Sequence, residues 1–215
     1  MKNALLKKIE AVVDNNIDNI NSCLSDLVRI PSVTGKEAEA QKYVEKMYKD
    51  IGLKVESFIP DIVKLKKHPA YVHLDPEDNR YFNRPNVEGI LEGTGDAKSI
   101  KLNAHIDTVP PGPEDGWKYP PTSGNIIGDR LYGLGAVDNK HGVVANYFAV
   151  KCLLESGIVP EGKIILESAV EEEDGGAGTL AGLIEGYTAD GLIVTDTVSD
   201  DEGINIACEI GRAHV

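Results

Sequence analysis

Two short apolar runs, residues 163–170 (KIILESAV) and 191–195 (GLIVT), constrain the fold of this 215-residue chain more than any other feature. Both runs are short and rich in aliphatic residues, which predicts buried strands. A helical pattern over residues 178–185 separates them, and a longer one over residues 139–155 precedes the first. Strands that alternate with helices predict an α/β domain, with a mixed, partly parallel sheet flanked by helices.

The rest of the chain continues this alternation. We predict helices over residues 4–29 and 38–50, strands over 53–58, 86–91, 99–102 and 203–208, and short extended pieces over 124–127 and 130–132. Thr34 is the expected cap of the second helix, and residues 68–85 form an irregular excursion. The glycine-rich segment 92–96 predicts a hairpin turn between the two strands on either side of it.

Composition excludes several classes of protein. The formal net charge of −13 argues against a nucleic-acid partner, because phosphate binding needs clustered Lys and Arg. The three cysteines (Cys23, Cys152 and Cys208) lie far apart, which indicates neither a disulfide framework nor a thiolate metal site. The chain begins without a leader-like segment and has no apolar run of membrane-spanning length, so we expect a cytoplasmic protein without a membrane partner.

Polar side chains directly follow three of the predicted strands. His105 and Asp107 follow residues 99–102, the four acids at 171–174 (EEED) follow the KIILESAV strand, and Asp196 follows the GLIVT strand. Taken alone, a histidine beside an aspartate is more often a loop residue, and a charge run is more often a solvated face. Open α/β sheets, however, bind ligands outside the carboxyl ends of their strands. Acids and a histidine follow three strands that should end at the same edge of the sheet. This arrangement predicts a functional site at that edge, which we call the rim.

The crowding of acids at this rim favours a metal site. Asp138 joins it from a glycine turn before the following helix, where it also fits the role of an N-cap worth about 1 kcal/mol. Two like charges about 4 Å apart repel by roughly 4 kcal/mol at an effective dielectric constant near 20. Divalent cations would relieve that repulsion.

Charge balance is consistent with two zinc ions. Two Zn²⁺ ions bring four positive charges, which three carboxylates and one hydroxide neutralise. The candidate ligands are Asp138, Glu173, Asp196 and a neutral His105. Glu172 is adjacent to a ligand but is not needed as one, so we expect it to act as the general base.

Several motifs occur together in the order and strand context of a known group of enzymes. These motifs are LNAHIDTVP, GLGAVDNKHG, EEEDGG and TDT, and the segments LVRIPSVTG, PNVEGILEGTG and GWKYPPTSG fit the same group. Over nearly its whole length the chain resembles the co-catalytic zinc hydrolases that include acetylornithine deacetylase, succinyl-diaminopimelate desuccinylase and related carboxypeptidases. The resemblance implies a zinc-peptidase-like catalytic domain with two zinc ions per site, although Co²⁺ or Mn²⁺ suits the same mixed ligands.

The resemblance also implies a role for each of six residues. The metal ligands are His105 and Asp196 on one metal, Glu173 on the other and Asp138 bridging both, and the catalytic residues are Asp107, which orients the histidine, and Glu172, the general base. It further implies a cis peptide between Asp138 and Asn139. Asn139 stands where the family more often has methionine, and Asp196-Thr197 stands where many relatives have Glu-Pro.

The resemblance implies a longer protein. A lid or dimerisation domain and a last histidine ligand follow in the family, so we expect residues 1–209 to be the amino-terminal part of the catalytic domain of a parent that forms a homodimer. Residues 210–215 (IGRAHV) are what the codons ATC GGA AGA GCA CAC GTC encode, a string like that of a sequencing-library adaptor. We expect them to be a non-native tail, in which His214 is not the missing ligand.

The expected function is hydrolysis of an amide bond in a small N-acyl amino acid or peptide, in the manner of the deacylases named above. One alternative is a dipeptidase or carboxypeptidase of the same family. Another is a metal- or amino-acid-binding protein without catalysis, or a chain that is inactive as a fragment. The residues do not indicate which acyl group or amino acid is recognised.

Overall fold

A computed structural model describes residues 2–72, 81, 83–196, 199–200, 203–204 and 207–209. The helices are α1 (Lys2–Arg29), α2 (Ala38–Asp50), α3 (Ile62–Leu65), α4 (Lys140–Glu155) and α5 (Ala177–Ile184), with a 3-10 turn at Glu114–Gly116. The strands are β1 (Lys54–Phe58), β2 (Asn86–Leu91), β3 (Ile100–His105), β4 (Asn125–Ile127), β5 (Arg130–Tyr132), β6 (Ile164–Ala169), β7 (Gly191–Val194), β8 (Ser199–Asp200), β9 (Gly203–Ile204) and β10 (Ala207–Glu209). The expected tail at 210–215 lies outside the described residues.

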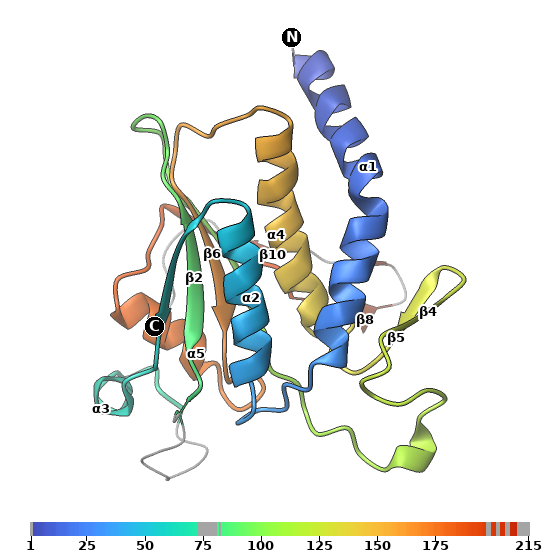
Figure 1. The fold of residues 1–215 in the computed structure, drawn as a ribbon. Coiled ribbons are helices and arrows are strands. Elements are labelled where there is room, and N and C mark those ends of the chain that lie inside the picture. The colour runs from blue at the N-terminus through green and yellow to red at the C-terminus, as the bar shows by residue number, and fades with distance from the viewer. Residues whose placement is uncertain are drawn as a thin grey trace.

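A six-stranded mixed sheet forms the centre of the fold, as predicted (Figure 1). Its order is β1-β2-β6-β3-β7-β10. Strands β6, β3 and β7 run parallel to one another, whereas the β1–β2, β2–β6 and β7–β10 pairs are antiparallel. The parallel strands therefore end at the same edge, which is the edge where the sequence places its acids and histidine.

The predicted hairpin between β2 and β3 is wrong, because β6 lies between these two strands. The glycine-rich loop after β2 instead packs on the segment before β6, where the backbone N–H of Thr94 donates to Pro160 and that of Gly95 to Glu161. A turn-forming sequence fixes where the chain reverses, but it does not fix which strand becomes the neighbour.

Helices cover the sheet on both faces (Figure 1). Helix α2 packs on β1 and β2, α4 packs on β3 and β6, and α1 packs on α4. Helix α5 contacts β6 from the opposite face. The core between the sheet and α2 and α4 is apolar and includes Tyr48, Val87, Val143 and Leu166. No helix within the described ranges combines the length and the apolarity needed to cross a bilayer.

Two local predictions need correction. Thr34 does not cap α2: the N-cap residue is Glu37, and its side chain makes no capping hydrogen bond. Strand β3 continues through His105 rather than ending at Leu102, so the histidine belongs to the last position of the strand. The helix α3 was also not predicted, and Asp61 caps it by accepting hydrogen bonds from two backbone N–H groups.

A sealed ionic cluster lies between the sheet and α5. It consists of Glu88 on β2, Lys101 on β3 and Glu167 on β6, all at most 2% exposed. The Lys101 ammonium is 2.7 Å from Glu167 and 3.7 Å from Glu88. Gly182 of α5 lies directly over the cluster, since a Cβ at this position would come within 2.2 Å of Glu167 Oε1. The missing side chain lets the helix approach the buried acids closely.

Candidate metal centre

The predicted site residues meet at the carboxyl edge of the parallel strands. His105 is the last residue of β3, Glu172 and Glu173 lie in the turn after β6, and Asp196 follows β7. Asp138 reaches the same place from the turn before α4. The structure therefore confirms that the polar residues at the ends of these strands lie close together, as the sequence predicted.

The His105 ring is the centre of this group. Its Nε2 atom is 2.9 Å from Asp138, 3.5 Å from Asp196 and 3.8 Å from Glu172. The histidine is only 2% exposed, whereas the Asp138, Glu172 and Asp196 side chains are 57%, 45% and 32% exposed. A buried imidazole thus presents one nitrogen to a ring of acids that is open to solvent.

Asp107 fixes the other side of the imidazole. The Nδ1 atom of His105 lies 3.0 Å from the backbone carbonyl of Asp107 and 3.4 Å from its carboxylate. With Nδ1–H donating to these oxygens, Nε2 is left as the ligand atom. This contact agrees with the orienting role predicted for Asp107.

The Asp107 carboxylate also holds the acid turn. It accepts hydrogen bonds from the backbone N–H groups of Glu172 and Glu173, at 3.0 and 3.3 Å, and from the Thr34 hydroxyl at 2.9 Å. Thr34, expected to be a helix cap, therefore supports the site instead. One fully buried carboxylate fixes both the histidine and the two glutamates that face it.

The turn that carries Asp138 ends in a cis peptide between Asp138 and Asn139, as the resemblance implies. Asn139 takes the N-cap position of α4, so the alternative role of Asp138 as a cap is wrong. Among the described residues, neither amide atom of the buried Asn139 side chain has a hydrogen-bond partner. This environment is consistent with the methionine that the resemblance places at this position.

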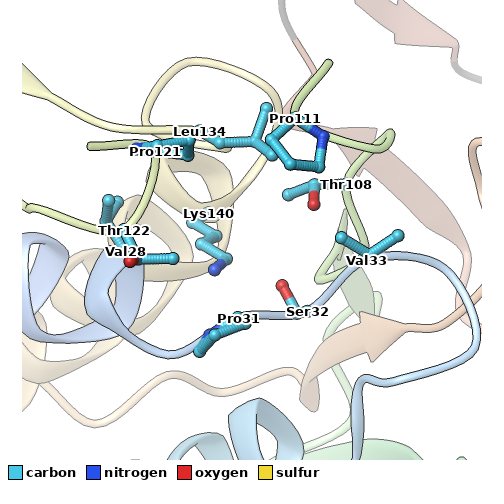
Figure 2. A pocket seen from close by; sticks show the side chains of 10 residues that line it. All are labelled: Val28, Pro31, Ser32, Val33, Thr108, Pro111, Pro121, Thr122, Leu134 and Lys140. Atoms are coloured by element: carbon cyan, nitrogen blue, oxygen red, sulfur yellow. The ribbon is translucent and has the colours of Figure 1, made fainter. Parts of the chain in front are cut away.

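Lys140 anchors the start of α4. Its ammonium donates to the carbonyls of Leu27 and Ile30 at the end of α1, at 3.1 and 2.7 Å. Burial lowers its pKa to about 8. Figure 2 shows Lys140 in a pocket that it shares with Val28, Val33 and Leu134, among others. None of the six predicted site residues lines this pocket, so the candidate centre is the open acid cluster and not the pocket.

The acids and the imidazole change one another's proton affinity. Burial by itself lowers the pKa of His105, but the hydrogen bond to Asp107 and the charges of the surrounding acids outweigh it and raise that pKa to about 9. Burial raises the pKa of Glu172 and of Glu173, and neighbouring carboxylates raise both further against the opposing effect of His105. The cluster therefore favours positive charge at its centre.

The donor atoms suit divalent metals. Ligand atoms of His105, Asp138 and Glu173 lie within 4.8 Å of one another, and so do those of His105, Glu172 and Asp196. One imidazole with several carboxylates is a donor set that accepts Zn²⁺, Mn²⁺ or Co²⁺. The first group contains three of the four predicted ligands, and the second contains the fourth, Asp196, together with His105 and the predicted base Glu172.

Three residues behind the site were not predicted. Arg84 bridges Glu37 and Glu171, and all three side chains are buried. Arg84 fell in a segment without periodicity, and Glu171 was not distinguished from the rest of its acid run. An arginine two positions before the strand that reads NVEGIL was the available signal, since a charge next to a buried strand needs a partner.

Comparison with known proteins supports the family resemblance that the motifs indicate. The family described as Peptidase family M20/M25/M40 matches residues 102–211. The chain belongs to this family of metallopeptidases. The matched segment covers the end of β3, the Asp138 turn, the acid turn and Asp196, so it includes every predicted site residue.

The sequence relatives include two proteins of the same name. N-formyl-4-amino-5-aminomethyl-2-methylpyrimidine deformylase of Halalkalibacterium halodurans is 31% identical over 91% of this chain and 42% of the relative. The Bacillus subtilis protein of that name is 40% identical over 54% of this chain and 28% of the relative. The chain thus spans less than half the length of these curated relatives.

Solved structures show the same fold. The di-peptidase Dug1p of Saccharomyces cerevisiae superposes with a TM-score of 0.72 at 19% identity, over 92% of this chain and 42% of that one. Aminopeptidase PepT of Bacillus cereus superposes with a TM-score of 0.61 at 27% identity, over 89% of this chain and 44% of that one. The mixed α/β sheet described here is therefore the fold of known metallopeptidases.

Proposed function

We propose that the full-length protein is a metal-dependent hydrolase that cleaves the amide bond of a small N-acyl amino acid or peptide. The observation that supports this most directly is the buried His105 nitrogen within 4 Å of three partly exposed carboxylates. Membership of a metallopeptidase family supports the same class of reaction. The cytoplasmic location and the homodimer expected from the sequence remain part of this proposal.

Four residues would hold two divalent ions, with His105 and Asp196 on one side, Glu173 on the other and Asp138 between them. When bound, such ions polarise a carbonyl oxygen and make a water molecule more acidic. Asp107 contributes indirectly, because it holds His105 in the tautomer that leaves Nε2 free to bind.

Glu172 is proposed to move the proton. Its carboxylate accepts a proton from the attacking water as the new C–O bond forms, and it delivers that proton to the leaving amine nitrogen as the C–N bond breaks. Burial and neighbouring acids raise the pKa of Glu172 above the usual 4.5, which makes its carboxylate a stronger base than a solvated one. The half-exposed side chain is accessible to a substrate that enters the open cluster.

The substrate is proposed to be an N-acyl compound with a small acyl group. Two sequence relatives are named as deformylases of an N-formyl pyrimidine, and a deformylase cleaves a formamide. A peptidase is the second candidate, because the chain is also 27% identical to an aminopeptidase over most of its length. Both candidates share the same bond type and the same site.

The test uses the full-length protein, stripped of metal and then reconstituted with Zn²⁺, Mn²⁺ or Co²⁺. N-formyl and N-acetyl amino acids and dipeptides would be assayed in parallel, and we expect hydrolysis of one class only after metal is added. Glu172→Gln should lower kcat by about 10²- to 10⁴-fold while metal stays bound.

The matched control is Asp174→Asn, which removes an exposed charge from the same acid run and should leave kcat unchanged. Full activity of Glu172→Gln would remove Glu172 from the mechanism. Tight metal binding without hydrolysis of any substrate would instead favour the non-catalytic alternative.

A further inference from the structure

A buried ion-pair bridge lies directly behind the acid turn. Arg84 precedes β2 and is 4% exposed, and two of its partners, Glu37 and Glu171, are both fully buried. Buried charges are retained where they are paired with good geometry, and removing one partner leaves an uncompensated charge. The bridge thus links the start of α2, the segment before β2 and the turn after β6.

The two ends of the bridge differ. Arg84 binds Glu37 through a two-pronged contact, with Nε 2.8 Å from one carboxylate oxygen and Nη2 2.6 Å from the other. Glu37 is fixed further by the backbone N–H of Gly35 at 3.1 Å. Arg84 then reaches Glu171 with Nη1 at 3.3 Å. Glu37 therefore holds the guanidinium in place, and the guanidinium holds Glu171.

The backbone conformation of Glu171 is one that favours glycine, which indicates that the glutamate side chain has a role at this position. Glu171 has a φ of 60°, in the left-handed region that glycine adopts freely and that costs other residues on the order of 1 kcal/mol. Gly175 and Gly176 follow shortly after in the same turn, yet the position with this backbone carries a glutamate. A glycine at this position would avoid the cost of the left-handed backbone, but it could not form the ion pair that Glu171 makes with Arg84.

Glu171 is the residue immediately before the two glutamates that face His105. The backbone N–H groups of Glu172 and Glu173 both donate to Asp107, and the Glu171 carbonyl accepts from Gly176. The acid turn is thereby fixed from in front by Asp107 and from behind by Arg84.

We propose that Arg84 is a positioning residue of the metal centre: through Glu171 it sets the acid turn so that the Glu172 and Glu173 carboxylates face the His105 nitrogen. This inference rests on the proposed function only in taking that cluster to be the metal site. The bridge adds no positive charge to the centre, because two carboxylates flank one guanidinium. Its contribution is geometric.

The alternative is that the bridge only stabilises the fold. Two variants of the full-length protein separate these cases. Glu171→Gly removes the contact on the side of the site and suits the left-handed backbone, whereas Glu37→Gln weakens the contact on the far side. The readouts are the Kd for Co²⁺, the visible absorption spectrum of bound Co²⁺ and the Tm.

We expect Glu171→Gly to weaken Co²⁺ binding by about 10- to 100-fold, the range found when residues that support metal ligands are removed, and to shift the Co²⁺ spectrum. Glu37→Gln keeps one acceptor oxygen for the guanidinium and leaves the Arg84–Glu171 pair in place, so it should lower the Tm while leaving the Kd within about threefold and the spectrum unchanged. Arg84→Lys keeps the positive charge but not the planar guanidinium, so its Kd for Co²⁺ should lie between those of the other two variants.

An unchanged Kd and spectrum in Glu171→Gly would overturn the proposal, as would equal losses in both variants that simply follow the Tm. Wild-type protein that binds no Co²⁺ would overturn the proposed function as well. Metal binding by the wild type with no response in Glu171→Gly would overturn this inference alone.

Discussion

Two clusters of acids belong to this sheet, one within its strands and one beyond the ends of its parallel strands, and their negative charges are balanced in different ways. In the sealed cluster, Glu88 and Glu167 share the ammonium of Lys101, and all three are shielded from water. In the candidate metal centre, Asp138, Glu172 and Asp196 lie close to a titratable imidazole, and these acids are 32% to 57% exposed.

The difference shows that crowded acids do not define a metal site by themselves. Burial and the charge of Glu167 raise the pKa of Glu88 well above its usual value, and the Lys101 ammonium pairs with both acids. The rim acids keep access to solvent, which lets a divalent ion reach them. In the sealed cluster a resident cation and burial remove the need for a metal, whereas the rim acids stay accessible to one.

The largest effect is expected from breaking the sealed cluster. Lys101→Met leaves Glu167 buried without its ammonium partner, so the free energy of unfolding should fall by about 3–5 kcal/mol. Lys64→Met is the matched control, because Lys64 pairs with Glu185 at 2.6 Å but is half exposed, and it should lower the free energy of unfolding far less. Denaturant unfolding measures both. Equal effects would mean that burial does not distinguish the two pairs.

Metal should stabilise the protein through the rim cluster by a smaller amount. At a free Zn²⁺ concentration 100 times the Kd, the stabilisation should be about 2.7 kcal/mol, seen as a rise in Tm. Asp138→Asn should lose most of this rise. Asp129→Asn, which changes an exposed aspartate in the turn between β4 and β5, should keep it. A full rise in Asp138→Asn would exclude Asp138 as a ligand.

The smallest change in stability is expected from substituting Glu88. Because its raised pKa favours the protonated form in the folded state, its contribution to stability is complete below the usual value of 4.5 and declines as the pH rises toward the folded pKa. Glu88→Gln mimics the protonated acid, so it should change stability by about 1 kcal/mol or less at low pH. Above about pH 4.5 the free energy of unfolding of the variant should increase relative to that of the wild type as the pH rises. A difference that is flat with pH would show that Glu88 ionises normally.

The sequence predicted that the rim residues lie together, because these residues are at or just after the ends of strands. His105, Glu172, Glu173 and Asp196 needed only the rule that parallel strands end together. The neighbour of β2 was not predictable in this way, since pairing with β6 depends on a segment far along the chain. Arg84 was missed for a similar reason, because its two glutamate partners are 47 and 87 residues away.

The central place of β6 also has a consequence for how the chain folds. Strands β2 and β3 leave the ribosome before β6, which later fills the position between them. At about 5–20 residues per second, the nascent chain holds both strands for seconds while their inner edges lack a partner. A direct pairing of β2 with β3 is incompatible with this order, so the native sheet can close only after β6 is available. High contact order of this kind slows folding. The acid turn follows β6 in the chain, so the metal centre is among the last parts of the sheet to assemble.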